Sequence, residues 1–172
     1  DQRAFEHATR ALELFRSLDN PVWQAYALND AGWYAARTGD HDLARRYCGE
    51  ALDLHRRHHN RNGQAAASDS LGFSHHHDGD HERAVAHYLR ALDLYRGLGH
   101  RFQVARTLSN LGEAHAALGR EDQARAAWEE ALELYLAQRQ TSAALRVRDR
   151  LERLRAFPGG TGALAAARRR LG

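Results

Sequence analysis

The chain repeats itself with a constant spacing along its length. The tetrad Ala-Leu-acidic-Leu begins at Ala11, Ala51, Ala91 and Ala131, so successive copies start 40 residues apart without slippage. A fixed period of this size is typical of a solenoid, in which one supersecondary unit stacks on the next. No single unit of this kind buries its apolar face alone, so the repeat predicts one core shared along a stack.

Each repeat contains two stretches of helical periodicity separated by a glycine. In the best-formed repeat we expect helix A over residues 102–118 and helix B over residues 121–137. Gly119 lies between them, and glycine readily adopts the left-handed conformation that ends a helix. The sequence therefore predicts an all-α fold of stacked antiparallel helical hairpins.

Small residues inside the helices indicate close packing between the two helices of a hairpin. A glycine in the middle of a helix costs about 1 kcal/mol relative to alanine, and this cost recurs at Gly32, Gly72 and Gly112. We expect larger residues of helix B to fill the space beside these glycines, namely Cys48, Tyr88 and Trp128. Cys48, the only cysteine, is thus predicted to be a small core residue, which suits a reducing cytoplasm.

These positions together resemble the tetratricopeptide repeat. The pattern is Leu-Gly, then Ala, an aromatic residue and Ala, and it reads Leu111-Gly112, Ala124, Trp128 and Ala131 in the third repeat. The period exceeds the usual 34 residues or so and no proline ends helix B, which resembles the longer repeat type. The resemblance implies a right-handed α-solenoid of antiparallel helical hairpins.

The resemblance also implies how the chain divides. We expect helix B of a truncated upstream repeat over residues 1–18 and three full repeats over residues 19–58, 59–98 and 99–138. A capping helix is expected over residues 139–155 and a basic tail over residues 156–172. The pattern begins inside a helix, so we expect the chain to be part of a longer protein.

In tetratricopeptide repeats the A helices line a concave face, so the resemblance projects a groove for a protein or peptide. Trp33 and Phe73 occupy equivalent positions and are expected to form its apolar pocket, although both rings could instead pack against a neighbouring helix. The projected groove residues are Tyr26, Asn29, Trp33, Arg37, Asp69, Phe73, His76, His77, Arg106, Ser109, Asn110, Glu113 and Arg146.

The amino-acid sequences of the repeats resemble those of the C-terminal repeat arrays in actinobacterial transcriptional regulators of the antibiotic regulatory protein family. This resemblance implies a cytoplasmic sensor module that binds a partner and controls upstream DNA-binding and NTPase domains. An alternative is a peptide receptor or scaffold without an NTPase. A weaker alternative is nucleic-acid contact through the tail arginines 168–170.

Other functions find little support in the sequence. The net charge of +3 is only mildly basic, and no apolar run is long enough to span a membrane. Twelve histidines invite a metal site, but neither cluster, His55 with His59 or 75–77 with His81, shows a converging further ligand. No phosphate loop or nucleophile motif is present. We therefore expect no catalytic residues, no cofactor and no metal.

Overall fold

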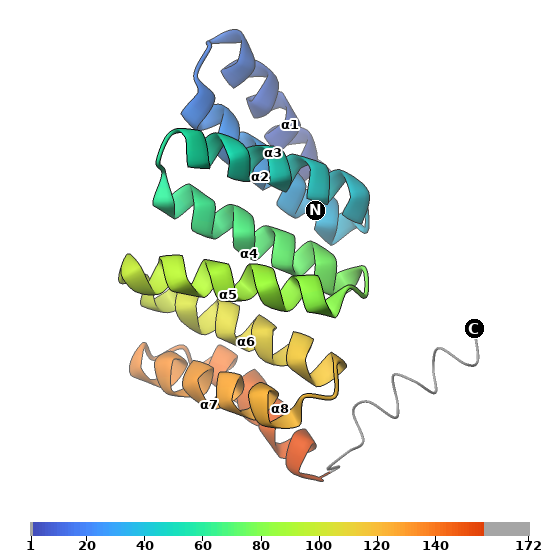
Figure 1. The fold of residues 1–172 in the computed structure, drawn as a ribbon, viewed down its shortest axis with the longest axis vertical. Helices are drawn as coiled ribbons and strands as arrows, with labels where there is room; N and C mark the ends of the chain where they lie inside the picture. The colour runs from blue at the N-terminus through green and yellow to red at the C-terminus, as the bar shows by residue number, and fades with distance from the viewer. Residues whose placement is uncertain (1, 157–172) are drawn as a thin grey trace, which may run out of the picture. The chain divides into compact units, whose positions relative to one another are not determined.

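The computed structural model describes residues 2–156, and these residues form eight α-helices and no strand (Figure 1). The helices are α1 (Gln2–Ser17), α2 (Pro21–Thr38), α3 (His41–Arg57), α4 (Arg61–His77), α5 (His81–Gly97), α6 (Arg101–Ala117), α7 (Glu121–Ala137) and α8 (Thr141–Ala156). The predicted all-α fold of helical hairpins is confirmed.

The helices belong to two compact units, unit 1 (Asp1–Leu94) and unit 2 (Tyr95–Gly172), with the division near the end of α5. In unit 1, α1 packs on α2, α2 on α3, and α3 on α4, while α2 also contacts α4. In unit 2, α6 packs on α7 and α7 on α8. Each unit is thus a series of neighbouring hairpins.

The turns between helices repeat at intervals of 20 residues, half of the sequence period. Each contains one residue with a φ between 49° and 93°, and these residues are Asp19, Gly39, His59, Gly79, Gly99, Gly119 and Arg139. The Asp40 amide donates to the Ala35 carbonyl at 2.9 Å and the Gly39 amide to the Ala36 carbonyl at 3.2 Å. This pair of bonds satisfies the last carbonyls of the helix and reverses the chain.

The predicted pairing of glycines with larger residues is confirmed. A Cβ at Gly72 would lie 2.6 Å from Cδ1 of Tyr88, which is fully buried. Additional Cβ atoms at Gly32 and Gly112 would collide with Cys48 and Trp128 in the same way. Only glycine lets the two helices of each hairpin approach this closely.

The observed helix limits lie close to those expected from the sequence. Helix α7 spans the predicted residues 121–137, and α6 begins and ends one residue before the predicted helix A. Ala156, which we assigned to the tail, is the last residue of α8. The rest of the expected tail, residues 157–172, lies outside the described residues.

Candidate functional site

Two rings meet on neighbouring A helices of unit 1. Trp33 of α2 and Phe73 of α4 lie with ring centroids 4.6 Å apart, and both side chains are half-buried. Phe73 also packs against the core formed by Ala35, Ala36 and Ala44. Phe73 therefore packs in the way that the second alternative expects, and both rings keep a part of their surface exposed to solvent.

Histidines extend this aromatic surface along α4. The ring of His77 lies 3.9 Å from that of Phe73, and its Nδ1 donates to the Phe73 carbonyl at 2.9 Å. His76 is half-buried beside His81, with their Nδ1 atoms 3.2 Å apart. Burial lowers the pKa of His76 to about 4, and His81 and His77 add to the effect. His76 is therefore neutral at pH 7.

The polar residues projected beside the two rings are mostly buried. Asp69 is 2% exposed and Asn29 is 8% exposed. The Oδ1 atom of Asn29 accepts no hydrogen bond within the described residues, although it is buried. Asn29 and Trp33 are four residues apart on α2, so they share one face of the helix. The unsatisfied acceptor is thus buried, whereas both rings are partly exposed.

Two further projected residues of unit 1 are placed differently. Tyr26 is half-buried, its hydroxyl accepts from Asn60 Nδ2 at 2.9 Å, and its ring lies 4.8 Å from that of His55. These contacts join α2 to the turn between α3 and α4, so Tyr26 holds the hairpins together. Arg37 is exposed near the end of α2.

In unit 2 the projected residues form a polar cluster on α6 and α8. Arg150 donates to Ser109 Oγ at 2.7 Å and forms an ion pair with Glu113. Arg106 and Asn110 are half-buried and Arg146 is exposed. Sequence reasoning missed Arg150, although the period of 40 relates it to Asn110. Ser109 and Glu113 are therefore held by α8.

The described residues offer no group of three histidine, cysteine, aspartate or glutamate side chains placed to hold a metal ion. His55 is buried against Gly63, and His75 stacks on His87 with ring centroids 5.3 Å apart. Burial raises the pKa of the Cys48 thiol to about 12, so it is an unreactive core residue as predicted. Among residues 2–156, no helix combines the length and apolarity needed to cross a membrane.

Hairpins of this kind, repeated at a fixed period with glycine against a large residue, define a helical-repeat protein. Models of the tetratricopeptide repeat match residues 24–65 and 63–137. Residues 24–137 therefore consist of tetratricopeptide repeats. Such repeats are generally protein-interaction modules and typically non-catalytic scaffolds.

One solved structure with a similar fold is BtubC (BKLC) from P. vanneervenii. It aligns with a TM-score of 0.73 at 20% sequence identity, over 97% of this chain and 71% of that chain. This likeness concerns the fold alone. A search of curated proteins finds no significant match.

Proposed function

We propose that the chain binds a protein or peptide and that the Trp33–Phe73 pair is the centre of its binding face. The observation that carries this proposal is the contact at 4.6 Å between two half-buried rings on neighbouring A helices. Aromatic side chains near the centre of an interface supply much of its binding energy, because they bury large apolar areas.

The polar surroundings of the pair favour a polypeptide partner. Asn29 and Asp69 are buried, so the projected polar residues of α2 and α4 that a bound segment can reach most readily are the exposed Arg37 and His77. In unit 2, Asn110 and Arg146 extend the proposal as additional contact residues.

We also propose that this module is the sensor of a larger cytoplasmic transcriptional regulator and controls its upstream DNA-binding and NTPase domains. The likeness of segments such as residues 109–134 to the repeat arrays of actinobacterial regulators supports this role. The sequence upstream in the parent protein tests it, because a phosphate-binding loop there would favour a regulator over a simple scaffold.

A capture experiment tests the binding face. The full chain is immobilised as wild type, as the double variant Trp33→Ala/Phe73→Ala, and as a control double variant Leu136→Ala/Leu145→Ala. The control removes two leucines of unit 2 that are 52% and 54% exposed. Proteins retained from a lysate of the source organism are quantified by mass spectrometry.

We expect at least one partner to be retained by the wild type and the control and lost with the double variant. Circular dichroism of all three proteins accompanies the capture. Equal recovery of every partner with the double variant would contradict the proposal. A collapse of helicity in that variant would show that the two rings belong to the core.

A further inference from the structure

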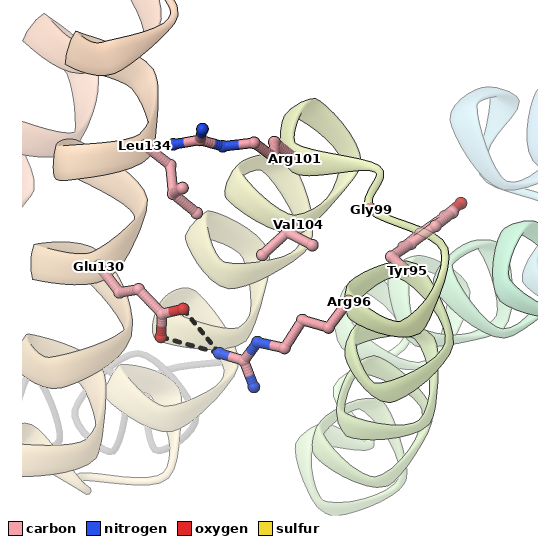
Figure 2. Close-up of a pocket in the computed structure, with 7 residues that line it drawn as sticks. All are labelled: Tyr95, Arg96, Gly99, Arg101, Val104, Glu130 and Leu134. Carbon is pink, nitrogen blue, oxygen red and sulfur yellow. Dashed lines mark hydrogen bonds and ion pairs between the residues drawn. The ribbon is translucent and has the colours of Figure 1, made fainter.

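Unit 2 contains a cavity whose lining includes none of the residues projected for the groove. It lies between the end of α5, the start of α6 and the second half of α7 (Figure 2). Val104 and Leu134 provide apolar walls, and Arg96, Arg101 and Glu130 provide its polar rim. Its volume is about 200 Å³. A cavity of about 150 Å³ holds a benzene molecule, so this one accommodates a single large apolar side chain.

The rim carries one positive charge in excess. Arg96 Nη2 lies 2.7 Å and 2.8 Å from the two carboxylate oxygens of Glu130, so these two charges cancel. Figure 2 shows this pair meeting across the cavity, with Val104 between its two helices and Arg101 extending toward Leu134. Within residues 2–156, no carboxylate pairs with the exposed guanidinium of Arg101. The rim therefore complements one added negative charge.

The same junction is filled differently in unit 1. Subtracting 40 from the residue numbers places Gln64 at the position of Val104 and Arg90 at that of Glu130. Gln64 Nε2 donates to the His55 carbonyl at 3.3 Å, so its side chain crosses the space that valine leaves open. In the first repeat the position is again glutamine, Gln24. The shorter, apolar Val104 thus distinguishes the junction in unit 2.

We infer that this cavity binds a partner peptide through one apolar side chain followed by an acidic residue. The apolar side chain enters between Val104 and Leu134, and the acidic side chain pairs with Arg101. A volume of about 200 Å³ is below the 300 Å³ or so at which pockets enclose a drug-sized molecule. It therefore suits one side chain of a longer segment, and the remainder of the peptide lies along the surface.

Blocked dipeptides test this inference on the full chain. The probe is acetyl-Leu-Glu-amide, and its two controls are acetyl-Leu-Gln-amide, which lacks the charge, and acetyl-Ala-Glu-amide, which lacks the anchor. Amide chemical shifts of the isotope-labelled protein are followed during titration to about 10 mM, because a ligand this small binds with a dissociation constant of about 1 mM. We expect saturable shifts at residues 95–104 and 130–134, and at least about fivefold weaker binding of both controls.

Two variants locate the effect, and a third is their control. Val104→Gln installs the residue found at positions 24 and 64, and it should abolish the shifts without unfolding the chain. Arg101→Gln should weaken binding of the probe about tenfold and leave acetyl-Leu-Gln-amide unaffected. Arg148→Gln, at an exposed arginine of α8, should change nothing. Absence of saturable shifts, undiminished binding by Val104→Gln, or equal affinity for the charged and uncharged dipeptides would each overturn the inference. These outcomes do not depend on Trp33 or Phe73.

Discussion

The two units build the same hairpin but differ in the side-chain caps at the starts of their helices. In unit 1, α2, α3 and α4 begin after Asn20, Asp40 and Asn60, and each of these side chains accepts a bond from the backbone three residues later. In unit 2, α6 and α7 begin after His100 and Arg120, which form no such bond. A capping side chain contributes about 1 kcal/mol to a helix.

Large side chains pack between the helices in both units. Trp128 is buried against Gly112, and its Nε1 donates to the Ser109 carbonyl at 3.0 Å. The equivalent residues in unit 1 are the much smaller Cys48 in the first repeat and the large, fully buried Tyr88 in the second. The comparison shows that the same turn geometry forms with a capping side chain at the start of the next helix, as in unit 1, and without one, as at α6 and α7.

The largest effect that we predict concerns the packing of unit 2. Gly112→Leu would drive a branched side chain into Trp128 and should lower the free energy of unfolding by about 3 kcal/mol. Gly49→Ala is the control, because nothing lies within 4 Å of an added Cβ there, and it should raise stability by about 0.5–1 kcal/mol. Urea denaturation measures both variants. Unchanged stability in Gly112→Leu would show that the close approach is unnecessary.

Acid should weaken unit 1. Burial lowers the pKa of His76 and His87 to about 4, from 6.5, and neighbouring positive groups contribute. Between these values the unfolded chain binds more protons than the folded one, so stability is complete above pH 6.5 and declines toward pH 4. We expect a loss of about 2 kcal/mol, after allowing for partial solvent screening.

Thermal unfolding across this pH window measures the loss. The double variant His76→Gln/His87→Gln should remove much of the pH dependence, whereas His58→Gln, at an exposed histidine, should retain it. An identical dependence in wild type and the double variant would assign the acid effect to other groups.

A reciprocal exchange of helix caps sharpens the comparison further. Asn60 and His100 have nearly the same φ, −81° and −82°, and their ψ angles are 88° and 69°. Asn60→His should cost about 1–2 kcal/mol, because the bonds to Gly63 and Tyr26 are lost. His100→Asn should gain up to about 1 kcal/mol by capping α6. Urea denaturation measures the free energy of unfolding of both variants. A loss of stability in both would mean that a side chain at position 100 cannot cap α6.

The smallest effect concerns equivalent surface ion pairs. Arg16 and Glu50 lie 3.5 Å apart in unit 1, and Arg96 and Glu130 lie 2.7 Å apart in unit 2, all about half exposed. Because water and salt screen such pairs, Arg16→Gln and Arg96→Gln should each cost less than about 1 kcal/mol. Denaturation at low and high salt measures the difference. A larger loss that persists at high salt would indicate a packing role for the arginine stem.

The periodic features of the fold could be predicted from the sequence. The helices, the turns and the pairing of glycines with Cys48, Tyr88 and Trp128 all recur at fixed intervals. Each of these features depends on residues within one hairpin, so the repeated sequence pattern is enough to predict it. The burial of Asp69 and Asn29 could not be predicted from the sequence. Helical spacing predicts the face of the helix on which a residue lies, but it does not predict how much of the side chain is exposed.

Contacts made by single departures from the repeat could not be predicted. The bond from Arg150 to Ser109 joins residues 41 apart in the sequence, and no other repeat has an arginine at that position. The cavity beside Val104 likewise depends on one residue that is shorter than its equivalents, Gln24 and Gln64. Such features follow from the lengths and directions of individual side chains.

The central claim is that unit 1 binds its partner through the face around Trp33 and Phe73. Hydrogen–deuterium exchange of the full chain, with and without a partner recovered by capture, tests it most directly, because no substitution is needed. We predict slower exchange in α2 and α4 on binding, centred on residues 29–37 and 69–77. Protection confined to α6 and α8, with α2 and α4 unchanged, would contradict the claim.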